Sequence, residues 1–172
     1  YNRIEDKIVA IPRKCQFRWS MVNSGLVKSL GLSATAGYDR QWGKFSRSTN
    51  ANYTCQRDRD YSSPADPEYK NSIPYSPLHS ASLIIDFGYD GYSLCTSWLY
   101  TGDRFALISN NREDMLGDWY TVDLKLNKQF HIGKHNVQAT IECNNLTDSR
   151  HEVVKRYPMP GRNWKFTLQW KI

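Results

Sequence analysis

The sequence has no long apolar run. Its 172 residues contain no stretch of about 18 consecutive apolar residues, so no membrane-spanning helix is predicted. No signal peptide is visible at Tyr1, and we expect a piece of a longer chain, or a mature product, whose leader and earlier domains are missing. Intrinsic disorder is not expected, because 40% of the residues are hydrophobic and only 23% are charged.

Catalytic and metal-binding motifs are missing as well. There is no Gly-x-Ser-x-Gly motif and no CxxC pair, and His131 and His135 flank a predicted glycine turn rather than sharing a helix face. The four cysteines are too widely spaced for a zinc site; we interpret them as mostly unpaired, although a disulfide framework stays open: Cys15, Cys55, Cys95 and Cys143. We therefore expect no enzyme activity, no cofactor and no bound metal.

Positive charge is not gathered into one block. The 23 basic residues exceed the 17 acidic ones, which gives a net charge of +6, but the two kinds are interspersed. No zinc finger, helix-turn-helix or glycine-rich phosphate loop accompanies them. The charge pattern predicts a solvated surface and no nucleic-acid partner.

The last ten residues alternate between apolar and polar side chains. Five of them would share one face of a strand: Trp164, Phe166, Leu168, Trp170 and Ile172. Side chains of a strand point to opposite faces in turn, so this segment has one apolar and one polar face. An aromatic face of this kind is typical of the closing strand of an outer-membrane β-barrel.

The same period of two recurs along the whole chain, which favours β-structure over amphipathic helix. It predicts an all-β fold of about eight strands, over residues 1–11, 18–41, 46–58, 75–87, 91–108, 116–131, 136–150 and 161–172. Short connections that carry glycine, such as Asp90-Gly91, alternate strictly with longer ones. This rhythm is typical of an antiparallel up-and-down transmembrane barrel with tight turns on one side and long loops on the other.

The charged residues of the predicted strands test whether lipid could surround them. Lys125, Glu142 and Lys165 all fall in the polar register. A basic side chain turned toward lipid at mid-bilayer costs about 2–4 kcal/mol. One choice of face keeps all three out of lipid, and a slip of one residue would expose them together.

Several segments together resemble one family, the TonB-dependent outer-membrane receptors. The segment Ile141–Asp148, with its Asn-Asn-Leu-Thr-Asp turn, leads to Tyr157-Pro-Met-Pro-Gly-Arg162 and then to the amphipathic final strand. Upstream, Ile73–Ser80 (IPYSPLHS), Trp98–Phe105 (WLYTGDRF) and Tyr1–Ile8 (YNRIEDKI) are similar to strand starts and ends of these receptors, in the same order.

The resemblance implies a specific function and specific partners. Such receptors are barrels of roughly 22 strands closed by a plug domain. They import scarce ligands such as siderophore-bound iron, haem or cobalamin, powered by the TonB complex. The chain would correspond to the C-terminal part of the barrel, residues 1–172, without a plug. Its partners would be the remaining strands, the plug, the TonB complex through that plug, and the lipid of the Gram-negative outer membrane.

Ligand contact is expected in the long loops, where arginine forks suit the carboxylates or phosphates of an anionic ligand. The candidates are Arg57, Arg59, Tyr61, Tyr69, Arg104, Asn110, Asn111 and Arg112. Acidic residues also crowd one of these loops, but without the spacing of a calcium loop, so a solvated loop is favoured there: Asp58, Asp60, Asp66 and Glu68.

Three other functions stay open from the sequence. A complete small eight-stranded barrel, acting as an adhesin or structural protein, would pair residues 2–9 with residues 164–170. A soluble lipocalin-like binder would turn the apolar faces inward. An outer-membrane enzyme would need a catalytic pair, and no Ser/His pair lies in register.

Overall fold

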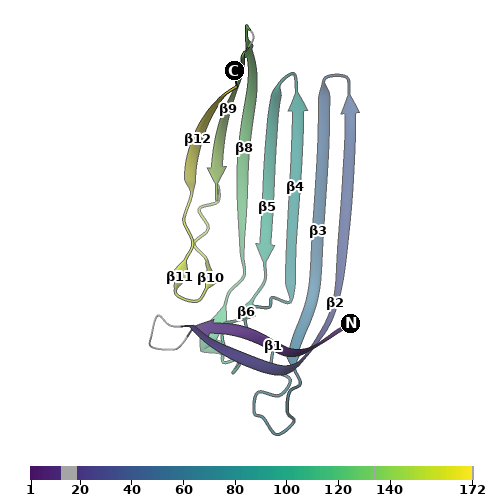
Figure 1. Ribbon diagram of the computed structural model, residues 1–172, viewed down its shortest axis with the longest axis vertical. Helices are drawn as coiled ribbons and strands as arrows, with labels where there is room; N and C mark the ends of the chain where they lie inside the picture. Colours follow the sequence, from purple (N-terminus) through teal and green to yellow (C-terminus); the bar gives the residue numbers. More distant parts are fainter. Residues whose placement is uncertain (13–18, 134, 172) are drawn as a thin grey trace.

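Eight long strands form one antiparallel sheet in the computed structural model, which describes residues 1–12, 19–133 and 135–171 (Figure 1). The spatial order is β1-β2-β3-β4-β5-β8-β9-β12. Their bounds are β1 Asn2–Pro12, β2 Trp19–Trp42, β3 Phe45–Asp60, β4 His79–Tyr89, β5 Tyr92–Thr101, β8 Trp119–Ile132, β9 His135–Asn144 and β12 Asn163–Lys171. No helix in the described part of the chain is long and apolar enough to cross a membrane.

Each long strand pairs with the next one along the chain, which confirms the predicted up-and-down topology. The two outer strands, β1 and β12, lie at opposite edges of the sheet and do not pair with each other. The sheet is therefore an open arc and not a closed barrel. A complete eight-stranded barrel is not formed, because it requires that edge-to-edge pairing.

The strand ends next to the long loops differ from the prediction. β5 stops at Thr101 and not at residue 108, because the Gly102 amide donates to the carbonyl of His79 and ends the ladder. β9 stops at Asn144, because Asn145 has a positive φ of 52° and its side chain accepts from the Ser149 amide. β4 starts at His79, since the prolines before it cannot donate to a ladder.

Short elements occupy the long loops instead. β6 (Arg104–Phe105) pairs with β7 (Met115–Leu116), and a single 3₁₀ turn, η1 (Arg112–Asp114), lies between them. β10 (Glu152–Val154) pairs with β11 (Tyr157–Pro158). All of these lie at the long-loop end of the sheet, opposite the tight turns (Figure 1).

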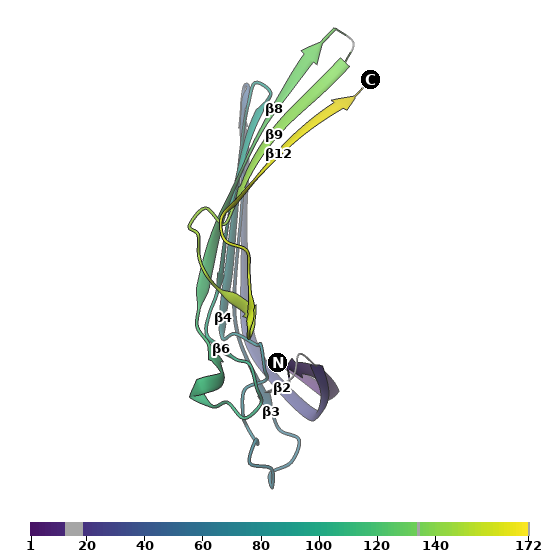
Figure 2. The same cartoon turned by 90° about the vertical axis from the view of Figure 1, so that its left-hand side faces the viewer.

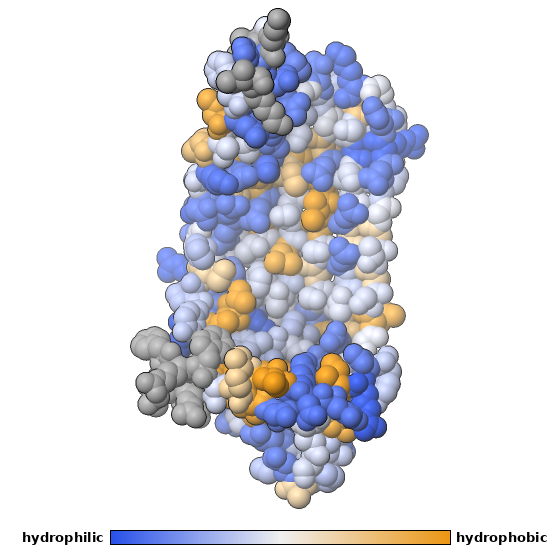
Figure 3. All heavy atoms as spheres, viewed as in Figure 1, coloured by the Kyte–Doolittle hydropathy of each residue, from blue (hydrophilic) through white to orange (hydrophobic). Residues whose placement is uncertain are grey.

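The sheet is curved, and its concave face is polar. Figure 2 shows β8, β9 and β12 leaning toward the side on which β1 also lies. Figure 3 views this side, and most of the surface over the long strands is hydrophilic. Scattered apolar residues interrupt it, among them Ile84 and Leu99, which the register places on this inner face.

An ion-paired row crosses this inner face. Lys125 of β8, Glu142 of β9 and Lys165 of β12 are direct neighbours in the ladder. The two lysine ammoniums lie 3.1 Å and 3.4 Å from the Glu142 carboxylate. The prediction that these three residues share the polar face is confirmed, and all three avoid the outer surface.

The outer face carries an uncharged band bounded by arginines. On β3 the outward residues between Arg47 and Arg57 are Thr49, Ala51, Tyr53 and Cys55. The two arginines are ten positions apart, which is about 34 Å along a strand and about 24 Å across a membrane at a 45° tilt. An apolar band of about 25 Å is typical of transmembrane barrels. The outward face of this sheet therefore matches the hydrocarbon layer.

The apolar row of β12 lies on the same outer face. The four described members are strongly exposed: Trp164 59%, Phe166 71%, Leu168 72% and Trp170 58%. Ile172 lies outside the described residues. These side chains do not gather in an interior core, as a lipocalin-like binder would require.

Candidate functional site: the long-loop end

The long loops are fastened to one another by buried polar residues. Arg104, at the start of β6, is only 4% exposed and spans two loops. Its guanidinium donates to the carbonyl oxygens of Glu152 at 2.5 Å, Val153 at 3.3 Å and Gly117 at 3.4 Å. Burial lowers the pKa of Arg104, but an arginine remains charged at neutral pH. The two carbonyl acceptors on Glu152 and Val153 thus hold the β6–β7 loop against β10, and the third, on Gly117, closes the loop on itself.

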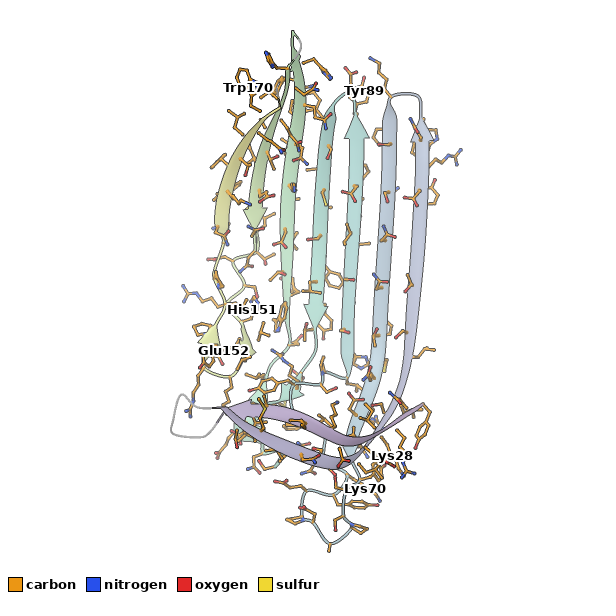
Figure 4. The ribbon with its side chains drawn as sticks, in the orientation of Figure 1. Lys28, Lys70, Tyr89, His151, Glu152 and Trp170 are labelled. Carbon is orange, nitrogen blue, oxygen red and sulfur yellow. The ribbon has the colours of Figure 1, made fainter. Side chains whose placement is uncertain are left out.

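An ion pair adds a second fastening between the same loops. The Lys155 ammonium lies 2.7 Å from Asp114 Oδ1 and donates to the carbonyl of Glu113 at 2.6 Å. Asp114 is 5% exposed. Nearby, the ring of His151 stacks on Trp119, with 4.2 Å between centroids. Figure 4 shows His151 and Glu152 beside the sheet on the β10 segment.

The loop after β3 is tied to the β6–β7 loop through Asn110. Its side-chain amide donates to the carbonyl of Ser72 at 2.9 Å, and its Oδ1 accepts from the Ser72 amide at 2.7 Å. Ile73, 2% exposed, lies next to this contact in sequence, and the amide of Tyr75 donates to the Phe105 carbonyl. Burial raises the pKa of the Tyr75 hydroxyl. Three long loops therefore form one connected layer.

A cavity of about 480 Å³ opens on the inner face of the sheet, next to this loop layer. We call it the mouth cavity; its lining includes Lys7–Ala10 of β1, Thr54, Gln56 and Asp58 of β3, and the segment 73–77. Asp58 accepts from the Gln56 amide at 2.9 Å on both oxygens and from the Ser76 hydroxyl at 2.6 Å. The cavity thus places a hydrogen-bonded carboxylate and Lys7 among apolar side chains such as Ile8 and Ile73.

The predicted acidic loop is only partly solvated. Asp58 and Asp60 are each 6% exposed, so the expectation of a solvated cluster is wrong for these two. Both belong to β3 and point inward, because the strand continues past its predicted end at residue 58 and includes Asp60. Burial, and then the negative charges of Asp66 and Asp60, raise the pKa of Glu68. Within the described ranges, no group of ligating side chains suits a metal ion.

The structure does not bring the eight predicted ligand residues into one site. Arg57 and Arg59 lie on the outward face of β3, opposite Asp58 and Asp60. Arg104 and Asn110 are committed to loop carbonyls, as described above. Ligand contact by these four residues stays a prediction.

The other four candidates remain in the loops. Tyr61 and Tyr69 pack edge to face, with centroids 5.5 Å apart. Asn111 and Arg112 have exposed side chains beside and within η1. Sequence reasoning missed the fastening residues Asp114 and Lys155, and no local pattern marks them.

The three described cysteines are free thiols, as expected for unpaired residues. Cys143 lies on the apolar face between Leu124 and Trp164, and Cys95 lies on the polar face beside Asp86. Cys55 lies on the outer face. Cys15 lies outside the described residues.

Comparison with known proteins identifies the family. The family model described as "TonB dependent receptor-like, beta-barrel" matches residues 1–146. The chain belongs to this family. Its relatives are outer-membrane proteins of Gram-negative bacteria, which places these strands in that membrane. A search of curated protein sequences returns no match.

Three solved structures share the fold. The copper transporter OprC superposes with a TM-score of 0.65 at 15% identity, over 94% of this chain and 26% of its own. BauA, the ferric preacinetobactin receptor from Acinetobacter baumannii, has a TM-score of 0.61 at 8% identity, over 84% of this chain and 26% of its own. FyuA, the ferric yersiniabactin uptake receptor from Yersinia pestis, has a TM-score of 0.58 at 17% identity, over 86% of this chain and 23% of its own. The chain spans about a quarter of each of these proteins.

Proposed function

We propose that this chain forms part of the wall of a TonB-dependent transporter for a scarce, metal-containing ligand. The open sheet carries this proposal, because both edges, β1 and β12, present unpaired backbone. Unpaired edges of long strands are unstable and invite further pairing. The remaining strands and a plug domain of the same receptor would cover them, and β12 would be the closing strand.

The orientation follows from the two kinds of connection. The tight turns would face the periplasm and the long loops the outside, as in outer-membrane barrels generally. The connected loop layer would form the outer rim, and the mouth cavity would open inward, toward a ligand inside the barrel. We propose direct ligand contact for Asn111 and Arg112 and for the polar lining of the mouth cavity.

The names of the three similar proteins support a metal-containing ligand. OprC is described as a copper transporter, and BauA and FyuA as receptors for ferric siderophores. A large carrier for iron or copper would need a wide barrel and an energy supply, which the TonB complex would provide through the plug. No step of this proposal requires enzyme chemistry.

Uptake by whole cells tests the proposal. Cells that carry the full receptor, cells that lack it, and cells that lack TonB would be compared with labelled copper and labelled ferric siderophores. We expect that one of these labelled compounds is taken up only by cells that have both the receptor and TonB. Mass spectrometry of the native protein gives a second test: a mature chain of these residues alone, with its own leader, would contradict the proposal.

A further inference from the structure

Basic residues form a row on the outer face, just beyond the uncharged band. The register places Arg3 of β1 opposite Lys28 of β2, and Lys28 opposite Arg59 of β3. Arg57 lies on the same face of β3, one row nearer the band, opposite Leu30. We call Arg3, Lys28, Arg57 and Arg59 the outward basic patch. It lies at the long-loop end of the sheet.

These cations have little neutralising charge of their own. Arg3 pairs with Glu5 at 2.8 Å, on the surface. Among the described residues, no salt bridge involves Lys28, Arg57 or Arg59. The nearest carboxylates along β3, on Asp58 and Asp60, lie on the opposite face. The patch therefore presents net positive charge to whatever surrounds the barrel at this height.

Aromatic rings and a further lysine extend the patch. The Lys28 ammonium lies 4.5 Å from the ring centroid of Tyr61, and the Lys70 ammonium lies 5.2 Å from that of Tyr69. Figure 4 shows Lys28 and Lys70 close together at the long-loop end. Rings at this position are typical of the interface between hydrocarbon and headgroups.

An apolar surface adjoins the patch on the membrane side. Leu30 and Leu32 of β2 are 65% and 71% exposed and lie on the same outer face. Cations next to exposed aliphatic side chains match an amphiphile with phosphate at its head and acyl chains below. A transported ligand inside the barrel could not reach this outer face.

We propose that the outward basic patch binds lipopolysaccharide, through the phosphates of its lipid A. In the proposed orientation the patch lies at the outer leaflet, where this phosphorylated glycolipid is found. The arginine forks of Arg57 and Arg59 would hold phosphate oxygens, Lys28 would add charge, and Leu30 and Leu32 would contact acyl chains. This inference rests on the proposed orientation of the barrel.

Binding of fluorescent lipid A to the full receptor in detergent tests the proposal. The variant K28Q/R57Q/R59Q is expected to bind about tenfold more weakly, because each basic residue near an anionic headgroup contributes to affinity. The matched control is R40Q/R47Q/K128Q, which removes the same charge from the same face at its other end. The control is expected to bind within about twofold of the unmodified receptor.

Two results would overturn the proposal. Equal losses in the two triple variants would show that only overall charge matters, and no loss in K28Q/R57Q/R59Q would show that the patch is not the site. Lipid A without phosphates provides a test on the unmodified receptor, in which no variant can misfold. Undiminished binding of this lipid would also overturn the proposal. The uptake assays test the transport proposal separately from the lipid proposal, because lipid binding is measured without a transported ligand.

Discussion

The Lys155 ammonium lies 2.7 Å from the Asp114 carboxylate and joins two loops that are 41 residues apart in sequence. The Lys155 side chain is 24% exposed and that of Asp114 is 7% exposed. A carboxylate this deeply buried needs a partner, because an unpaired buried charge is costly. The pair therefore fixes how the β6–β7 loop lies against the β10–β11 loop.

Replacing Lys155 should loosen these two loops without unfolding the sheet. In Lys155→Gln, Asp114 loses its cation, and we expect the loop contact to weaken by about 1–3 kcal/mol. Hydrogen exchange of the full receptor would show faster exchange in residues 103–118 and 150–160. Lys44→Gln is the matched control, because it removes an exposed pair with Asp90 at a tight turn. Unchanged loop exchange in Lys155→Gln would contradict this account.

Arg104 should not be replaceable by lysine. Its two terminal nitrogens reach carbonyls on two separate segments, near Gly117 and near Glu152. An ammonium has the charge but not the planar fork, so Arg104→Lys should lose part of this contact. We expect about tenfold faster proteolysis of the loops, which corresponds to one lost charged hydrogen bond. Proteolysis as slow as in the unmodified receptor would mean that the fork is dispensable.

Charge on the outer face should be far more harmful than charge on the inner face. Leu83 lies outward on β4, between Ala51 and Trp98, while its neighbour Ser82 points inward. Leu83→Arg is expected to cost about 2–4 kcal/mol of stability in lipid, and Ser82→Arg much less. Urea unfolding of the receptor in bilayers, or its level in the outer membrane, measures the difference. Equal effects would show that the two faces meet the same solvent.

Gly31 should be intolerant of a side chain, unlike Gly37 on the same strand. A Cβ on Gly31 would lie 2.9 Å from the carbonyl oxygen of Cys55 and 3.2 Å from the Cα of Gln56. A Cβ on Gly37 would meet only a side-chain oxygen, at 3.5 Å. Gly31→Ala is therefore expected to destabilise the β2–β3 pairing by about 1–3 kcal/mol, and Gly37→Ala by little. Thermal unfolding of the two variants in detergent compares them; equal midpoints would count against the observed pairing.

Most of the fold could be predicted from the sequence because alternation and turn residues are local signals. The Asp90-Gly91 turn was readable because both residues adopt positive φ, 45° and 79°, as a tight hairpin requires. Lys125, Glu142 and Lys165 share a face because strand period alone decides it. The strand ends were less predictable, since side-chain contacts from the loops determine them.

The site was harder to predict because its contacts are distant in sequence. Arg104 donates to the carbonyl of Glu152, 48 residues away, and no local sequence pattern near either residue predicts this contact. Arg57 and Arg59 are a different case. Their outward direction follows from the alternation with Asp58 and Asp60. Arg59 lies beyond the predicted strand end at residue 58, whereas Arg57 lies inside the predicted strand, where the alternation already indicates its outward direction. Strands that extend beyond the membrane carry polar residues, which resemble a loop in sequence.

A membrane-embedded wall requires lipid around the outer face of β12. Spin labels at single cysteines, placed in turn at positions 164 to 170 of the full receptor in bilayers, would measure this directly. Labels replacing Trp164, Phe166 and Leu168 should collide with oxygen, which concentrates in lipid, and labels replacing Lys165 and Gln169 with a water-soluble nickel chelate. An inverted pattern, or no alternation along the strand, would contradict the assignment of this sheet to a membrane-embedded barrel wall.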